Sequence, residues 1–400
     1  MKFICSLSIW IYFSFIFIDK VSAQSSVQIL PSPINNSTAN ESSPSLSGNG
    51  RMLLYSAPMG DYDEQKFCLS IQKNGSWSSP EIIPQVNTEA KKLYTGGHFL
   101  TYEGSQIYFS TAKFGGVGGN DIWMSTKQGN TWSAATNLGK PINSNNNDGD
   151  PSVSSDGRFL FFTRTESKKT TTGKPCGKIY LSQKLSKENW EEPKPLPSPI
   201  NMGCECNARL LPDQRGISFA SQRAGGKGGY DQYIAQWNAD GTWSIPKPLS
   251  LINSPEDDLY ISIPAGGDYV YMAAKNKTNT DIARSLLPND LKPAKSILLT
   301  VTIKLPGNTA NIKGSTAVYK NSKSYLVYPN QEGKYFISLA AKDDVEINFQ
   351  ADYKKYLPKI VRYNLDTLTK YKELGMEIIL KPISNNCVYQ FSKYPLQGTE

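Results

Sequence analysis

The chain has 400 residues, of which 38% are hydrophobic and 20% charged, and its formal net charge at pH 7 is +8. This length allows two or three domains, and the content of 31 Gly, 25 Pro and 22 Tyr favours turns and strands. No dense block of Lys and Arg occurs, which argues against nucleic acid as a partner because that function needs a concentrated basic face.

The first 23 residues have the pattern of a secretory signal. Lys2 precedes an apolar run at residues 3–18, and a small-x-small cleavage site ends at Ala23. This run of 16 residues is short for a membrane-spanning helix, and no later stretch is apolar for long enough to span. We therefore expect a signal peptide at 1–23 and an exported mature chain without a transmembrane segment, located in the periplasm, at the outer membrane or in the medium.

Residues 27–253 contain an internal repeat. An Ile-Asn or Val-Asn pair recurs five times at intervals of 52 to 58 residues, and a turn followed by an alternating strand, such as "SSDGRFLFFTR" from Ser154, lies between successive pairs. A tryptophan precedes most of the pairs: Trp77, Trp132, Trp190 and Trp243. Each unit is interpreted as four short strands, which is typical of a propeller blade, with the tryptophans filling the space between blades.

A glycine-rich motif occurs twice, as "GGVGGND" ending at Asp121 and as "GGKGGYD" ending at Asp231. Asp281 occupies the equivalent position in the last repeat unit. Glycines permit left-handed backbone, and a short Asp side chain can accept hydrogen bonds from the amides of such a loop. The loop lacks the helix and the Lys-Ser/Thr of a phosphate-binding loop. We expect a structural role for these three aspartates.

The N-terminal stretch resembles the end of a repeat. "VQILPSPIN" from Val27 is similar to "PKPLPSPIN" from Pro193, and the last unit has no tryptophan in its fourth strand position. The hypothesis is that residues 27–30 pair with the last blade and close the ring.

These repeats resemble the WD-type repeats of the TolB and tricorn propellers, whose signature is nearly complete in "SSDGRFLFFTR" and "SQRAGGKGGYDQY". The resemblance implies an all-β fold in which residues 24–293 form a five-bladed propeller, with six blades as the alternative. The loops at residues 59–66 and 166–177 depart from the pattern, so they are predicted to face a partner.

Residues 296–383 form a second predicted unit. Period-two alternation runs through Tyr335, Ile337 and Leu339 and again through Val345 and Ile347. This segment is similar to the carboxypeptidase-regulatory-like β-sandwich, and residues 384–400 follow it as a tail.

A propeller followed by such a sandwich resembles exported OmpA-family proteins of Bacteroidetes, including one of the type IX secretion system. The OmpA-like domain of those proteins has no counterpart here, so peptidoglycan binding is not carried over. The resemblance implies a non-enzymatic binding or scaffolding component of the cell envelope, whose partners are envelope proteins or glycans.

Five cysteines follow the signal, and an exported protein can form disulfides. In a propeller, the loop that holds Cys176 and the segment that holds Cys204 and Cys206 share one face of neighbouring blades. A disulfide is therefore predicted from Cys176 to either Cys204 or Cys206. The sole histidine, His98, and the absence of a second ligand pair with zinc spacing argue against a metal site.

Carboxylates at the propeller funnel supply the alternative function. Five-bladed propellers can host glycosidases, which need two or three such groups, and the candidates are Asp148, Asp150, Glu205, Asp257 and Asp258. They lack aromatic-flanked acidic motifs, no G-x-S-x-G nucleophile motif occurs, and the acidic turns do not match a calcium-binding EF-hand loop. The prediction is therefore no enzymatic activity and no cofactor, with a carbohydrate-active enzyme or glycan-binding module as the alternative.

Overall fold

The computed structural model describes residues 27–383 except 37, 59–64, 88–92, 113–115, 170–174, 187–188, 277–278, 309, 313–314, 321–322, 331 and 353. The predicted signal and the C-terminal tail lie outside the described residues. Within them the fold is almost entirely β, with one short helix at Pro84–Asn87 (α1). None of the described helices is long and apolar enough to cross a membrane.

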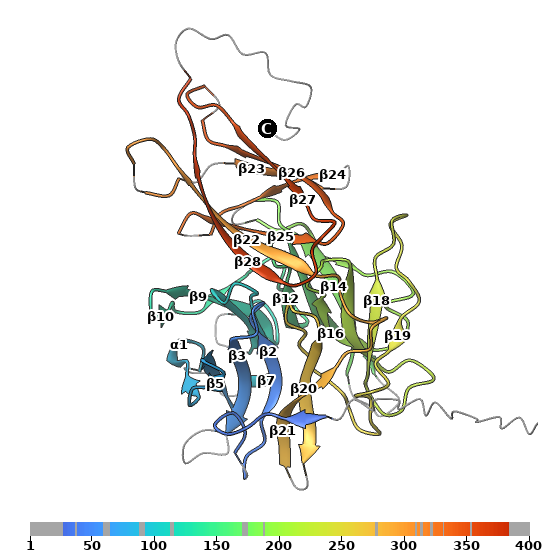
Figure 1. Cartoon of the computed structure of the whole chain (residues 1–400). Helices are drawn as coiled ribbons and strands as arrows, with labels where there is room; N and C mark the ends of the chain where they lie inside the picture. Colours follow the sequence, from blue (N-terminus) through green and yellow to red (C-terminus); the bar gives the residue numbers. More distant parts are fainter. Residues whose placement is uncertain are drawn as a thin grey trace, which may run out of the picture.

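Antiparallel sheets stand around a common axis in the part of the chain described before residue 290 (Figure 1). The first sheet has β2 (Ser42–Leu46), β3 (Met52–Pro58), β4 (Gln65–Lys73), β5 (Ser76–Trp77) and β6 (Glu81–Ile82). The second has β7 (Leu93–Leu100), β8 (Gln106–Thr111), β9 (Asp121–Gln128), β10 (Thr131–Trp132) and β11 (Thr136–Asn137). The third has β12 (Asn147–Val153), β13 (Phe159–Lys169), β14 (Pro175–Gln183) and β15 (Lys194–Pro195).

Two more sheets complete the ring of described strands. The fourth has β16 (Glu205–Leu210), β17 (Gly216–Ser221), β18 (Asp231–Gln236) and β19 (Lys247–Pro248). The fifth has β20 (Tyr269–Asn276), β21 (Asn279–Leu286) and β1 (Gln28–Ile29), and its innermost position is reduced to a single bridge between Ser262 and Tyr271. The fold is a β-propeller.

In each propeller sheet, the turn between the first and second strands has a residue with left-handed backbone at the same position. Gly50, Gly104, Gly157 and Gly267 have φ values of 69°, 71°, 72° and 69°, and Gln214 holds the equivalent position with φ 58°. Glycine adopts this conformation at low cost, whereas glutamine is strained there. This substitution is why "PDQRGISFASQ" is the weakest copy of the repeat in the sequence.

The recurring asparagines bind the third strand of each sheet. The Asn143 side chain accepts a hydrogen bond from Ile122 N (2.8 Å) and donates one to Ile122 O (3.0 Å), as a neighbouring strand would. Equivalent pairs of bonds join the other four to the third strands of their own sheets: Asn35 to Ile282, Asn87 to Phe67, Asn201 to Ile179 and Asn253 to Gln232. We call these five residues the clasp asparagines.

Buried apolar clusters lie between successive sheets, and one of them joins the last sheet to the first. That cluster contains Leu30, Ile34, Leu46, Tyr271 and Ile282, so the ring is closed. Strand β1 pairs with β21, as the N-terminal hypothesis predicts. The tryptophans take part in this packing: Trp132 and Trp243 are buried, and Trp77 and Trp190 pack at the margins of neighbouring clusters.

Seven further strands form two sheets with a shared core. One sheet has the order β25 (Lys334–Ala340), β22 (Ser296–Lys304) and β28 (Lys372–Ile379). The other has the order β24 (Lys323–Val327), β23 (Ser315–Lys320), β26 (Asp344–Gln350) and β27 (Lys359–Asn364). The alternating residues Tyr335, Ile337, Leu339, Val345 and Ile347 are all buried in the core between the sheets.

This sandwich packs on one end of the propeller, against the turns between first and second strands (Figure 1). Arg215 of such a turn forms an ion pair with the buried Asp343 (2.8 Å), and the Arg158 guanidinium stacks 3.4 Å from the ring centroid of Tyr325. Leu298 of β22 joins a core cluster of the second and third propeller sheets. These contacts leave the opposite end of the propeller as the end that faces away from the sandwich.

Replacing Asn35 by alanine is expected to lower the free energy of unfolding by about 1–3 kcal/mol, because three buried or half-buried backbone groups of Leu30 and Ile282 lose their partner. Asn145→Ala, at an exposed position, serves as the matched control with an expected change within about 0.5 kcal/mol. Thermal and denaturant unfolding measure both variants. Equal stability of the two would contradict a stabilising role for the Asn35 hydrogen bonds.

Candidate binding site in the propeller funnel

A cavity of about 370 Å³ opens at the end of the propeller that faces away from the sandwich. Its volume falls in the range of small-molecule sites. It is lined by the inner strands β12 and β16, by β13 and β14, by the residues directly before β9 and β18, and by the segment before Ile261. The lining residues are Asn120, Asn147, Gly149, Asp150, Thr163, Thr165, Gly177, Cys206, Tyr230, Asp257, Leu259 and Tyr260. The lining is rich in amides, hydroxyls and carboxyls.

The predicted funnel carboxylates separate into two groups. Asp150 and Asp257 line the cavity, whereas Asp148, Glu205 and Asp258 do not. Asp148 forms an ion pair with Arg164 (2.6 Å) and accepts a hydrogen bond from Ser144 N (2.7 Å). Asp258 accepts a bond from Ser254 N in the same way, and Glu205 accepts one from Gly203 N. These three acids hold the loops that enter their blades.

The glycine-rich loops are held by acids and by the next blade. Asp231 accepts hydrogen bonds from the amides of Lys227 and Gly228, and Asp121 binds Val117 and Gly118 in the same way. Asp281 instead accepts bonds from the side chains of two asparagines, Asn276 and Asn279.

Asp257 has a structural contact as well as a place in the lining. Its Oδ1 accepts a hydrogen bond from Tyr230 N (3.0 Å), and Asn147 holds Asn120 N (2.9 Å) at the equivalent place. A Cβ on Gly229 would clash with the Asp257 Oδ1, so a larger residue there would displace the Asp257 carboxylate. The loop of one blade is thus fastened to the beginning of the next, at the rim of the cavity.

Asp150 differs from the other acids because its position in the repeat carries no acid elsewhere. The equivalent residues are Ser43, Asn207 and Tyr260, and all four have φ between 50° and 56° at an irregularity of the inner strand. The Asp150 side chain is 9% exposed, and its Oδ1 has no hydrogen-bond partner. Burial raises the pKa of its carboxyl, although hydrogen bonding from Thr163 and the charge of Arg209 oppose the shift.

Arg209 and Tyr102 fill the propeller axis beyond the cavity. The guanidinium of Arg209 donates to Ser45 Oγ (3.0 Å) and to His98 O (3.1 Å), so the fourth blade is tied to the first and second across the axis. Tyr102 donates to Leu210 O and Ile263 O at 3.3 Å. Burial lowers the pKa of Arg209 to about 10, so the side chain stays charged at neutral pH. These hydrogen bonds join the blades across the axis, next to the cavity lining.

His98 has no place in the cavity lining. Its ring is buried and its centroid lies 4.7 Å from that of Phe67. Burial, together with the charge of Arg209, lowers the pKa of His98 to about 3, so the ring is neutral at neutral pH. The part of the chain that the structure describes holds no cluster of metal-ligating side chains.

Three cysteines, Cys176, Cys204 and Cys206, lie in or near the cavity lining. Cys176 is joined to Cys204 in a disulfide, one of the two pairings that the sequence left open. Cys206 is a free, half-buried thiol in the cavity lining. Burial raises the pKa of this thiol well above its usual value, and the charges of Asp150, Glu205 and Asp257 act in the same direction. The thiol is therefore protonated at neutral pH.

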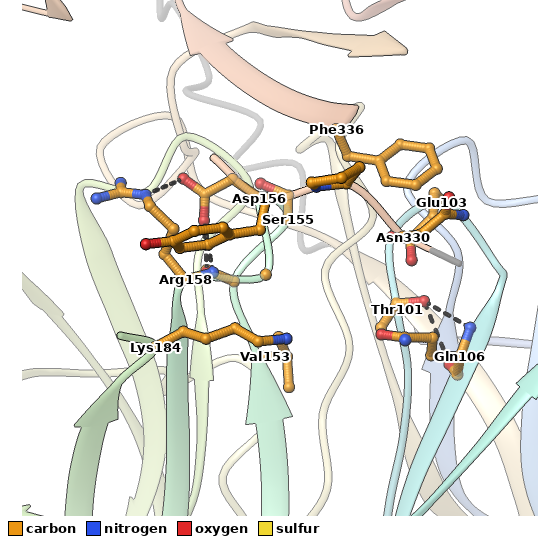
Figure 2. Close-up of a pocket in the computed structure, with 14 residues that line it drawn as sticks. Thr101, Glu103, Gln106, Val153, Ser155, Asp156, Arg158, Lys184, Asn330 and Phe336 are labelled. Carbon is orange, nitrogen blue, oxygen red and sulfur yellow. Dashed lines mark hydrogen bonds and ion pairs between the residues drawn. The ribbon is translucent and has the colours of Figure 1, made fainter. Parts of the chain in front are cut away.

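A second, smaller cavity of about 60 Å³ lies between the propeller turns and the sandwich (Figure 2). Figure 2 shows Asp156 paired with Arg158 (2.7 Å) on one side and Thr101 bonded to Gln106 on the other. This volume holds only about two water molecules, which is too small for a ligand site. We interpret the cavity as a gap in the packing between the propeller and the sandwich. The loops predicted to face a partner fall mostly outside the described residues, at 59–64 and 170–174.

Sequence reasoning missed Asn147, Thr163, Tyr230 and Tyr260 as lining residues. A position-by-position comparison of the repeats could have predicted Tyr260 as a lining residue, because Tyr260 holds the same repeat position as Asp150. Asn147 and Tyr230 could not be found in that way, since they line the cavity only because neighbouring blades meet there.

No family model and no curated protein matches the chain. Solved structures do match. A TolB-like structure from Agrobacterium tumefaciens is 15% identical over 76% of this chain and 80% of its own, with a TM-score of 0.38. An α-L-arabinofuranosidase from Lactobacillus brevis is 12% identical over 66% and 95%, with a TM-score of 0.44. An oligogalacturonate lyase from Vibrio parahaemolyticus is 10% identical over 68% and 96%, with a TM-score of 0.39.

These matches concern the fold, and they correct one prediction. The sequence predicted that the chain is not an enzyme, and that prediction is wrong as an inference from this fold, because the similar structures include glycosidases and a lyase. The TolB-like match agrees with the propeller resemblance, whereas no family model connects the chain with OmpA-family or type IX secretion proteins.

Counting the free thiols of unfolded, unreduced protein tests the disulfide. Cys204→Ser is expected to raise the count by one relative to the wild type, because it releases Cys176, while Cys206→Ser is expected to lower it by one. Cys204→Ser is also expected to lose about 2–4 kcal/mol of stability. A count that falls in both variants would contradict the bridge.

Proposed function

We propose that the chain is a carbohydrate-active protein that binds a glycan in the funnel cavity. The observation that supports the proposal most directly is the cavity itself, which is of small-molecule size and is lined by amide, hydroxyl and carboxyl side chains together with apolar surface. Sugars present many hydroxyl groups, each of which donates and accepts hydrogen bonds, and such a lining offers partners of both kinds.

The aromatic residues in the lining fit the same ligand. Tyr230 and Tyr260 are among the lining residues, and sugar rings have apolar C–H faces that pack on aromatic surfaces. Two carboxyl groups, Asp150 and Asp257, lie in the same cavity, and a pair of carboxyls is what acid–base cleavage of a glycosidic bond requires. Binding and cleavage are therefore both to be measured.

An exported location would place this cavity among the glycans of the cell envelope. The pattern of residues 1–23 supports that part of the proposal. Expression of the full chain in a bacterial host is expected to give an envelope-associated or secreted protein whose first residue is Gln24. N-terminal sequencing of the protein from each cell fraction measures this, and an uncleaved protein in the cytoplasm would contradict it.

Purified protein is expected to bind at least one member of a panel of neutral, N-acetylated, aminated and acidic oligosaccharides, measured by calorimetry. Asp150→Asn is expected to weaken that binding about tenfold or more, because a buried carboxyl that contacts ligand is replaced by an amide. Asparagine tolerates the positive φ of this position, so the variant is expected to fold.

Glu256→Gln is the matched control, since it removes an exposed charge next to Asp257 without entering the lining. It is expected to bind as the wild type does. Release of reducing ends from a bound oligosaccharide would add hydrolysis to binding. Absence of binding across the whole panel by folded protein would overturn the proposal.

A further inference from the structure

The charges of the cavity are all of one sign. Asp150 and Asp257 are its ionisable carboxyls, and among the described lining residues there is no Lys, Arg or His. Two arginines are engaged with other acids: Arg164 pairs with Asp148, and Arg223 lies 3.7 Å from Glu205 and donates to Ile200 O. Arg209 lies outside the lining and acts on Asp150 through its charge. The charged side chains of the lining itself therefore favour a neutral or cationic ligand and oppose an anionic one.

The carboxyl of Asp150 lacks a hydrogen-bond donor at one of its two oxygens. Its Oδ1 is buried without a hydrogen-bond partner. Arg209 acts on Asp150 through its charge, while two of its nitrogens donate to Ser45 and to His98 O. Thr163, Tyr260 and the Asn207 amide donate hydrogen bonds to the Asp150 carboxyl, whereas its Oδ1 is left without a donor. A buried carboxylate oxygen without a donor is costly, and a ligand that brings a positively charged donor to Oδ1 removes that cost.

Building on the proposed function, we propose that the glycan bound in the funnel carries a free amino group, whose ammonium donates to Asp150. Tyr230 and Tyr260 are among the lining residues, and aromatic faces attract a cation. Thr163, Thr165 and Asn147 are further polar residues of the lining for the sugar hydroxyls, and Thr163 and Asn147 also accept hydrogen bonds from Asn207 N and Asn120 N. The ligand class is an amino sugar that is not N-acetylated, since acetylation removes both the charge and two of the donor hydrogens.

The test compares three oligosaccharides of equal length by calorimetry: one of glucosamine, one of N-acetylglucosamine and one of galacturonate. Wild-type protein is expected to bind the glucosamine oligomer about tenfold tighter than the N-acetylated one and to show no binding of the galacturonate oligomer. Asp150→Asn is expected to remove the preference, whereas Glu256→Gln is expected to keep it.

Asp150→Ser is a second variant for the case that Asp150→Asn fails to fold, because Ser43 holds the same backbone conformation in the first blade. Equal binding of the aminated and acetylated oligomers would overturn this inference and leave the proposed function standing. A preference that survives in both Asp150 variants would overturn the assignment to Asp150. No binding of any oligosaccharide would overturn the inference and the proposed function together.

Discussion

The propeller depends on the paired hydrogen bonds that each clasp asparagine makes with the backbone of a third strand. Each one offers a carbonyl oxygen and an amide group to a single residue of the third strand, so a side chain takes the place of part of a neighbouring strand. Asn35 makes the same pair of bonds with Ile282, 247 residues away in the chain. The N-terminal segment thereby takes the fourth-strand position in the last sheet. Because a single four-stranded sheet cannot bury both its faces, this closure lets every sheet have two neighbours.

The internal repeat also separates structural acids from an acid that is free to act on a ligand. Glu41, Asp148, Glu205 and Asp258 occupy one position of the repeat, and each accepts a backbone hydrogen bond from the loop that precedes its strand. Their recurrence is explained by that shared duty. Asp150 lies two residues further along its strand, and no other blade has an acid there. A side chain that the architecture does not require, buried with an unpartnered oxygen at a cavity, is the strongest sign of function in the molecule.

The two ends of the propeller have different neighbours. Arg209 and Tyr102 cross the axis with hydrogen bonds to other blades, and the sandwich packs on the turns at the end where the first strands finish. The cavity lies at the other end, where glycine-rich loops and blade beginnings meet. The Cys176–Cys204 disulfide lies at this same end and joins the third blade to the fourth. The lining is thus held by covalent and hydrogen-bonded links between blades, which limits how much it must reorganise when a ligand binds.

Much of the architecture is local and could be predicted from the sequence: the repeat, the alternating strands, the aspartates of the glycine-rich loops and the two cysteine pairings. These depend on residues close together in the chain, whose spacing and type restrict the backbone. The candidate site could be predicted only in part. Asp150 and Asp257 were named among five acids. Comparing the repeats could have singled out Asp150, because no other blade has an acid at its position, but it could not have shown that Asp150 and Asp257 line a cavity. Only the tertiary structure decides which carboxyl meets an arginine, which meets a backbone amide and which faces the cavity, since each of these partners comes from another strand or another blade.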